Sequence, residues 1–272
     1  MDQYRVFGNP IAQSKSPFIH QSFAEQTQQN LNYQSQLAQV NDFKQAVRAL
    51  IANNGKGANV TAPFKEQAYE LADQLSERAL KAGAVNTLTF KDGKILGDTT
   101  DGIGLVADLY RHEVILKDKT ILLLGAGGAA KGVVSSLLQE SPLQLIIANR
   151  TVNKAQAIGQ QYPAGQVQAI SFEELTEVKA DIIINATSAG LSGSKLPISN
   201  AIFQHCQVCY DMVYGKSLTP FLQLAGEQGV EQVIDGLGML VEQAAESFAI
   251  WRGVRPETKA VYNALREQLA SS

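Results

Sequence analysis

Cysteine and histidine are scarce in this chain, which limits the metal and redox chemistry available to it. Its 272 residues include only two cysteines, Cys206 and Cys209, and three histidines. Structural zinc sites need four Cys or His ligands, and no second Cys/His pair complements the group at 205–209. Residues 207–213 have the pattern of a buried strand, on which three-residue spacing directs two side chains to opposite faces. The sequence therefore predicts core packing for both cysteines, and neither a metal site nor a disulfide.

Long apolar runs and an excess of one charge are also missing. No apolar stretch approaches the ~20 residues needed to span a bilayer, and Met1 to Arg5 lack the apolar core of a signal peptide. A net charge of −3 gives no electrostatic attraction toward nucleic acid or an anionic membrane. Hydrophobic residues at 45% and charged residues at 18% are typical of globular domains. We expect a soluble, cytoplasmic monomer or homodimer whose partners are small molecules.

Length and patterning indicate two domains. A chain of 272 residues exceeds one average domain. Residues 1–101 alternate strand and helix patterns and end in a hairpin around Asp92-Gly93. Continuous apolar runs then occur at 121–124, 145–148, 182–184, 208–210 and 233–234. Such runs, separated by helical or irregular connections, are typical of a parallel sheet covered on both faces.

Two helical stretches close the chain, at 239–251 and 257–269. Because the second sheet domain is complete without them, we expect them to pack back on the first domain and leave a cleft. The predicted fold class is α/β. An open N-terminal α/β domain comprises residues 1–101 plus 237–272, and the parallel-sheet domain comprises residues 102–236.

A glycine-rich turn follows the first apolar run of the second domain. Gly125, Gly127 and Ala130 match the spacing G-x-G-x-x-G/A, between a strand and a helix. Gly125 permits the tight turn, Gly127 lets a pyrophosphate approach the backbone, and the helix N-terminus attracts that anion. The sequence therefore predicts a Rossmann-type domain that binds a dinucleotide at this glycine-rich turn.

The end of the next apolar run indicates which dinucleotide is bound. An NAD site places a carboxylate there for the ribose 2′-hydroxyl. This chain instead has Asn149-Arg150-Thr151, with Lys154 one turn later. A missing carboxylate and added cations suit a 2′-phosphate, so the predicted cofactor is NADP(H). The alternative is that Arg150 is an ordinary solvent-exposed residue at the start of a helix. This alternative does not explain why the carboxylate of an NAD site is missing.

Lys65 and Asp101 are the candidates for proton transfer. Lys65 follows a short strand in the first turn of a helix predicted from about Pro63, where a cation opposes the helix dipole. A solvated surface lysine is the ordinary alternative. Asp101 precedes a helix at 103–111 and suits either an N-cap or a partner that keeps Lys65 charged. The residues alone leave both alternatives open.

Motifs along nearly the whole chain carry a family resemblance. They are GNPIAQSKSP (8–17), NVTAPFK (59–65), AVNT (84–87), GDTTDG (97–102), GAGGA (125–129), NRT (149–151), NATSAG (185–190), DMVYGKSLTP (211–220) and GLGMLVEQ (236–243). In this order they resemble shikimate dehydrogenase. The resemblance implies an oxidoreductase that reversibly reduces 3-dehydroshikimate to shikimate with NADPH, in aromatic amino acid biosynthesis. The alternatives are a quinate/shikimate dehydrogenase with relaxed cofactor use and a non-catalytic NADP-binding regulator.

The same resemblance assigns roles to individual residues. It implies that Lys65 and Asp101 are the catalytic pair and that Ser14 and Ser16 hold the substrate carboxylate. The remaining substrate-binding positions are Thr61, Asn86, Asp101, Tyr214 and Gln243. The cofactor-binding positions are Glu77, Gly125, Ala126, Gly127, Gly128, Ala129, Asn149, Arg150, Thr151, Lys154, Met212 and Gly236. Ser16 and Thr61 also suit an ordinary role as helix caps.

Overall fold

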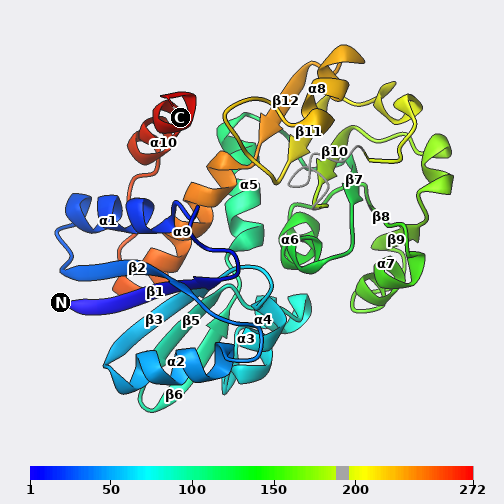
Figure 1. The fold of residues 1–272 in the computed structure, drawn as a ribbon. Helices are drawn as coiled ribbons and strands as arrows, with labels where there is room; N and C mark the ends of the chain where they lie inside the picture. The colour runs from blue at the N-terminus through cyan, green and yellow to red at the C-terminus, as the bar shows by residue number, and fades with distance from the viewer. Residues whose placement is uncertain (188–195, 272) are drawn as a thin grey trace. The chain divides into compact units, whose positions relative to one another are not determined.

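The computed structural model describes residues 1–187 and 196–271, which form two compact units (Figure 1). The first unit comprises Met1–Gly104 and Val241–Asn263, and the second comprises Leu105–Leu240 and Ala264–Ser272. Residues 188–190 of the predicted NATSAG motif lie outside the described residues. In the described part of the chain, no helix has the length and apolar character to cross a membrane.

A mostly parallel sheet forms the centre of the first unit. Its strands are β1 (Asp2–Gly8), β2 (Leu31–Leu37), β3 (Gly55–Val60), β4 (Gln74–Leu75), β5 (Thr87–Lys91) and β6 (Lys94–Asp98). They lie in the order β2-β1-β3-β5-β6-β4, and β5 runs antiparallel to both of its neighbours. The predicted hairpin joins β5 to β6 through Asp92 and Gly93, both of which have positive φ.

Helices cover both faces of this first sheet. They are α1 (Ser16–Gln26), α2 (Phe43–Ala52), α3 (Lys65–Leu71), α4 (Glu77–Ala82) and, from Val241 on, α9 (Leu237–Arg252). On one face, Phe43 of α2 stacks on Phe64 at a ring distance of 4.8 Å. On the other, Phe23 of α1 and Phe248 of α9 lie 5.8 Å apart. The sheet therefore has an apolar core on each side.

Close packing of α9 on the first sheet depends on a glycine. The Trp251 indole donates to the backbone oxygen of Leu88 at 3.1 Å. A Cβ at Gly57 would lie 2.7 Å from the same indole nitrogen, so a larger residue is excluded there. From Ala264 on, α10 (Lys259–Ser271) belongs to the second unit, where Arg266 donates to both carboxylate oxygens of Asp235 at 2.6 and 2.8 Å.

The second unit contains a fully parallel sheet. Its strands are β7 (Thr120–Leu124), β8 (Gln144–Ala148), β9 (Val167–Ile170), β10 (Ile182–Asn185), β11 (Val208–Asp211) and β12 (Gln232–Asp235). The strands lie in the order β12-β11-β10-β7-β8-β9. From β7, the chain adds β8 and β9 on one side and β10, β11 and β12 on the other, which is the arrangement of a doubly wound dinucleotide-binding fold. Its helical elements are α5 (Asp101–Arg111, from Leu105), α6 (Gly128–Gln139), α7 (Val152–Gly159), η1 (Glu173–Glu177), η3 (Asn200–Phe203) and α8 (Pro220–Glu227).

Alternating strand residues separate the two cores of this unit. Ile121 and Leu123 of β7 pack toward α5, α6 and α7, whereas Leu122 and Leu124 pack toward η1, η3 and α8. Both faces of every central strand are therefore apolar, because each is covered by helices. This explains why the sequence shows continuous apolar runs here.

The predicted orientation of the two thiols is wrong. Cys206 and Cys209 pack in the same core, and their sulfur atoms lie 3.6 Å apart. The strand begins only at Val208, so Cys206 precedes it and does not follow the alternation that the spacing argument assumed. Both cysteines are buried free thiols.

Candidate active site

Lys65 and Asp101 form a close ion pair in the first unit. The Lys65 Nζ lies 2.5 Å from Asp101 Oδ2, and their side chains are 21% and 8% exposed. Lys65 is the first residue of α3, and Asp101 is the first residue of α5. An ammonium group held this way in a largely buried place can donate a proton to a bound ligand while its charge is balanced.

Asn86 holds the other oxygen of the Asp101 carboxylate. Its Nδ2 donates to Asp101 Oδ1 at 2.8 Å and to Thr100 Oγ1 at 2.9 Å. Its Oδ1 accepts from the Thr100 backbone N–H at 2.9 Å and from the Thr87 hydroxyl at 2.7 Å. Asp101 Oδ1 and Oδ2 therefore have separate partners, which fixes the orientation of the carboxylate.

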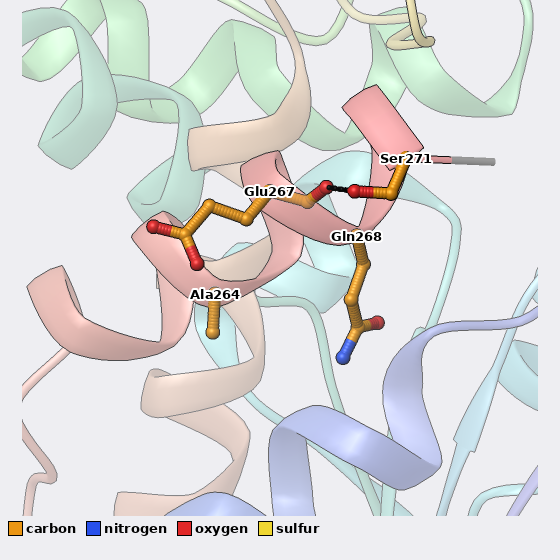
Figure 2. Close-up of a pocket in the computed structure, with 4 residues that line it drawn as sticks. All are labelled: Ala264, Glu267, Gln268 and Ser271. Carbon is orange, nitrogen blue, oxygen red and sulfur yellow. Dashed lines mark hydrogen bonds between the residues drawn. The ribbon is translucent and has the colours of Figure 1, made fainter.

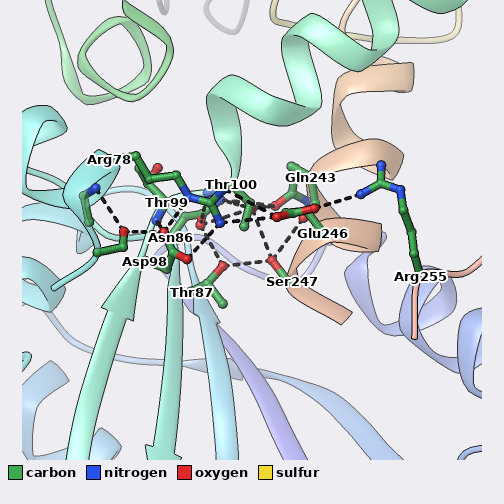
Figure 3. Close-up of polar contacts among 12 residues, drawn as sticks. Arg78, Asn86, Thr87, Asp98, Thr99, Thr100, Gln243, Glu246, Ser247 and Arg255 are labelled. Carbon is green, nitrogen blue, oxygen red and sulfur yellow. Dashed lines mark hydrogen bonds and ion pairs between the residues drawn. The ribbon is translucent and has the colours of Figure 1, made fainter. Parts of the chain in front are cut away.

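Helix α9 contributes further polar groups to this cluster. Gln243 Oε1 accepts from Asn86 Nδ2 at 3.3 Å, and one turn later Ser247 Oγ lies 2.8 Å from Thr87 Oγ1. Figure 3 shows Asn86, Thr87 and Thr100 directed toward Gln243 and Ser247. The predicted residues Asn86, Asp101 and Gln243 are thus brought together, although 157 residues separate Asn86 from Gln243.

Arg78 fixes α9 relative to the strand that precedes Asp101. Its guanidinium donates to both oxygens of Asp98 at 2.7 and 2.8 Å and to Glu246 at 3.4 Å. Arg255 binds the other Glu246 oxygen at 2.8 Å (Figure 3). These half-buried charges hold Gln243 and Ser247 in register with the end of β6.

Ser14 and Thr61 lie in loops and Ser16 is the first residue of α1, and none of the three caps a helix. The N-cap residues of α1 and α3 are Lys15 and Phe64, without side-chain capping bonds. The alternative role of Ser16 and Thr61 as helix caps is therefore wrong, and α3 starts at Lys65 instead of Pro63. The Ser16 N–H instead donates to Ser14 Oγ at 3.3 Å.

Tyr214 and Glu77 are two further residues to which the resemblance assigns a role. Tyr214 belongs to the second unit, where burial and the charge of Asp235 raise the pKa of its hydroxyl. Glu77, at the start of α4, is an exposed residue of the first unit. Lys81 binds its carboxylate at 2.7 Å and lowers its pKa. The roles implied for Tyr214 and Glu77 stay predictions.

The predicted pyrophosphate loop connects β7 to α6 in the second unit. Gly125 has φ +105°, which favours glycine, and Gly127 is the N-cap of α6. A Cβ at Gly127 or Gly128 would meet nothing within 4 Å, so neither glycine is needed for packing within the chain. Open space at a helix N-terminus suits the close approach of a pyrophosphate.

The segment predicted to select the 2′-phosphate lies beside this loop. Leu124 pairs with Ala148 in the sheet, and the Gly125 N–H donates to the Ala148 oxygen at 2.8 Å. Asn149, Arg150 and Thr151 follow directly. Arg150 and Lys154 are exposed, and among the described residues neither forms an ion pair. Both cations are therefore available to a phosphate.

Met212 and Gly236 meet at the carboxyl ends of β11 and β12. Asp211 pairs with Asp235, and a Cβ at Gly236 would lie 2.3 Å from the Met212 oxygen. Glycine is therefore required at this close approach. The glycine loop, the Asn149 segment and the Met212–Gly236 contact all lie at carboxyl ends of strands of one parallel sheet, where such sheets bind ligands.

A surface hollow elsewhere in the second unit does not involve the predicted site residues. Figure 2 shows it on the last turns of α10, lined by Ala264, Glu267, Gln268 and Ser271. The Ser271 hydroxyl donates to the Glu267 backbone oxygen at 2.9 Å. We assign this hollow no function.

Comparison with known proteins decides the family. Three family models match: the shikimate dehydrogenase substrate binding domain over residues 6–88, shikimate/quinate 5-dehydrogenase over 108–194, and the shikimate 5′-dehydrogenase C-terminal domain over 236–266. A protein from Colwellia psychrerythraea named shikimate dehydrogenase (NADP(+)) is 58% identical over 268 residues, or 98% of each chain. The chain belongs to the shikimate dehydrogenase family.

Solved structures agree with membership in the shikimate dehydrogenase family. The Ael1 enzyme from Pseudomonas putida is 45% identical, with a TM-score of 0.93 and coverage of 97% of this chain and 98% of that one. Shikimate 5-dehydrogenase from Thermus thermophilus, solved with NADP(H) and shikimate, is 30% identical, with a TM-score of 0.89 and coverage of 99% and 100%. The family resemblance, the α/β fold and the class of NADP-dependent oxidoreductase predicted from the sequence are confirmed.

Proposed function

We propose that this member of the shikimate dehydrogenase family reversibly reduces 3-dehydroshikimate to shikimate with NADPH. The observation that carries the proposal is the 2.5 Å ion pair between Lys65 and Asp101. NADPH, when bound, supplies the hydride for the ketone carbon. The chain itself has to bind both molecules and to deliver a proton to the ketone oxygen.

Lys65 is the proposed proton donor. As the ketone oxygen gains negative charge, the Lys65 ammonium transfers a proton to it. Asp101 keeps the ammonium oriented through Oδ2, while Asn86 holds Oδ1 at 2.8 Å. In the reverse direction, the neutral Lys65 amine accepts the proton from the shikimate hydroxyl.

The two units have separate proposed roles. In the first, Ser14 and Ser16 are proposed to bind the substrate carboxylate, and Thr61, Asn86, Asp101 and Gln243 the ring hydroxyls. Tyr214 is a further proposed substrate-binding residue. The second unit, as the Rossmann-type domain predicted at 102–236, binds NADP(H). The loop from Gly125 to Ala129 is proposed to bind the pyrophosphate. Asn149, Arg150, Thr151 and Lys154 are proposed to bind the 2′-phosphate end, and Glu77, Met212 and Gly236 the nicotinamide end.

We further propose a cytoplasmic enzyme that works as a monomer or homodimer. Its partners in this proposal are the two small molecules, without nucleic acid or membrane. The support is the modest net charge of −3, which gives no electrostatic preference for a polyanion.

An absorbance assay at 340 nm with shikimate and NADP⁺ tests the proposed function. We expect shikimate-dependent NADP⁺ reduction, with NADP⁺ preferred over NAD⁺ and shikimate over quinate. Equal use of quinate or NAD⁺ would identify the relaxed dehydrogenase instead, and NADP binding without turnover would identify the regulator.

The Arg150→Ala variant tests the choice of cofactor. We expect it to narrow the preference for NADP⁺, because a cation for the 2′-phosphate is removed. Arg48→Ala is the control, since Arg48 is an exposed residue on α2 in the other unit. An unchanged preference in Arg150→Ala contradicts the role of this arginine.

A further inference from the structure

A line of buried polar side chains lies behind the proposed substrate site and begins at Tyr33. The Tyr33 hydroxyl donates to Asn59 Oδ1 at 2.7 Å. Burial raises the pKa of Tyr33 well above its usual value, although the Ser16 side chain lowers it, so its hydroxyl keeps the proton that it donates. The His20 ring stacks on Tyr33 at 4.1 Å and restricts its movement.

The bond from Tyr33 sets the orientation of the Asn59 amide. Because Oδ1 accepts from Tyr33, Nδ2 is directed the other way. It contacts Ser247 Oγ at 3.0 Å, and Thr87 Oγ1 and the Asn86 backbone oxygen at 3.2 Å each. A flipped amide would place its oxygen against the Asn86 backbone oxygen, and neither atom can donate. Tyr33 therefore selects one direction of hydrogen bonding for the whole cluster.

This direction continues to the ion pair. The Thr87 hydroxyl accepts from Asn59 and donates to Asn86 Oδ1 at 2.7 Å. With Oδ1 engaged, Asn86 directs Nδ2 to Asp101 Oδ1, which leaves Asp101 Oδ2 for Lys65. A continuous series of hydrogen bonds thus joins Tyr33 to Lys65. Tyr33 and Asn59 are both buried.

We propose that Tyr33 and Asn59 are positioning residues, which orient the Lys65–Asp101 pair through Thr87 and Asn86. The inference rests on the proposed function, because it assigns the two residues to that reaction. Losing the Tyr33 hydroxyl frees the Asn59 amide to rotate, and the orientation of the Asp101 carboxylate is then no longer determined. Misplacement of a reacting group lowers turnover strongly.

The Tyr33→Phe variant tests this coupling, with Tyr4→Phe as the matched control. Tyr4 pairs with Tyr33 across β1 and β2, and both rings contact Trp251, but the Tyr4 hydroxyl contacts Arg252 instead of Asn59. In the assay with shikimate and NADP⁺, we expect Tyr33→Phe to lower kcat about tenfold, with a change below about threefold in KM for NADP⁺. The pH profile of kcat should change in Tyr33→Phe and stay native in Tyr4→Phe.

Ser247→Ala provides a second, independent variant in case Tyr33→Phe does not fold. It removes the hydroxyl that accepts from Asn59, and Ser22→Ala is its control. Both serines donate to a backbone oxygen one turn earlier in their helices, at 3.0 and 2.9 Å, but Ser22 lies outside the buried cluster. We expect Ser247→Ala to lower kcat and Ser22→Ala to leave it unchanged.

Two results would overturn the inference. One is a folded Tyr33→Phe or Ser247→Ala protein with native kcat and a native pH profile. The other is a Tyr4→Phe protein that loses as much turnover as Tyr33→Phe, since the effect would then come from packing. A native protein that does not oxidise shikimate refutes the proposed function itself, and that result precedes any comparison of variants.

Discussion

The two units differ in the groups that they offer to a ligand. The first presents buried side chains that bond to one another, among them Asn86, Asp101 and Lys65. The second presents mainly backbone, in the glycine loop between β7 and α6, next to a sheet whose central strands are mostly aliphatic. Side chains in a network depend on each other, whereas a backbone loop depends on the local turn. We therefore expect that a substitution in the network of the first unit affects the orientation of other side chains in that network. A substitution in the glycine loop of the second unit should affect only that loop.

The largest effect is expected from Lys65→Ala. Removing a positioned acid/base should lower kcat by about 10²- to 10⁴-fold. Lys44→Ala is the control, because Lys44 also pairs with a carboxylate, Glu70 at 3.1 Å, but is exposed. Steady-state kinetics with shikimate and NADP⁺ measures the difference. A Lys65→Ala enzyme within a few fold of native turnover would show that the side-chain cluster is not the reaction centre.

A core substitution in the second unit should affect stability without affecting the reaction centre. Leu145 in β8 is fully buried, whereas Leu143, two residues earlier, is 73% exposed. Leu145→Ala should lower the free energy of unfolding by about 2–5 kcal/mol, and Leu143→Ala by far less. Urea unfolding measures this loss, and kcat per folded molecule should stay native. A similar loss in both variants would contradict the predicted packing of β8.

Acid should destabilise the first unit through His20. Burial lowers the pKa of His20 to about 3. Between the ordinary value of 6.5 and about 3, the unfolded chain binds a proton that the folded chain does not. The free energy of unfolding should therefore fall as the pH drops through this range, by up to about 1.4 kcal/mol per pH unit from this residue.

The His20→Phe variant isolates this contribution. It keeps an aromatic ring on Tyr33 and removes the titrating group. Urea unfolding at several pH values should give a shallower loss of stability below pH 6.5 than in the native protein. The same slope in both proteins would assign the acid response to other residues.

A smaller effect is expected from Gly127→Ala. A Cβ at this position meets nothing within 4 Å, so the fold should tolerate it. The methyl group should obstruct the pyrophosphate and raise the Kd of NADP⁺ about tenfold, or about 1.4 kcal/mol. Fluorescence titration with NADP⁺ measures the change.

Gly226→Ala is the matched control for this loop. It lies in α8 of the same unit, and a Cβ there also meets nothing within 4 Å. We expect native affinity for NADP⁺ and equal or higher stability, because alanine favours helix. Weaker NADP⁺ binding in both variants would show that the Gly127 effect is not local.

Elements with a strong pattern could be predicted from the sequence, and short ones could not. The apolar runs of β7, β8, β10 and β11 and the hairpin at Asp92-Gly93 gave correct elements. The two-residue strand β4, the short helix α4 and β9 were not predicted, because their patterns are too short or too polar. Cys206 was misjudged for a related reason, since the start of a strand is less certain than its existence.

The sequence by itself determined the cofactor loop. Strand, glycine turn and helix are contiguous between Thr120 and Gln139, so local conformational preference and the spacing of glycines suffice to specify it. The loop after β8 likewise indicated NADP. Its residues Asn149, Arg150 and Thr151 directly follow one strand, so their position could be recognised without the tertiary structure.

Only the tertiary structure decided how the side chains of the first unit meet. Lys65 and Asp101 were candidates without a proven contact, and the series Tyr33, Asn59, Thr87 and Asn86 had no local signal. Its members come from separate strands and a loop, and Ser247 joins them from α9, 188 residues after Asn59. Sheet register and the packing of α9 bring such distant groups within hydrogen-bonding distance, and neither is encoded in any short stretch of chain.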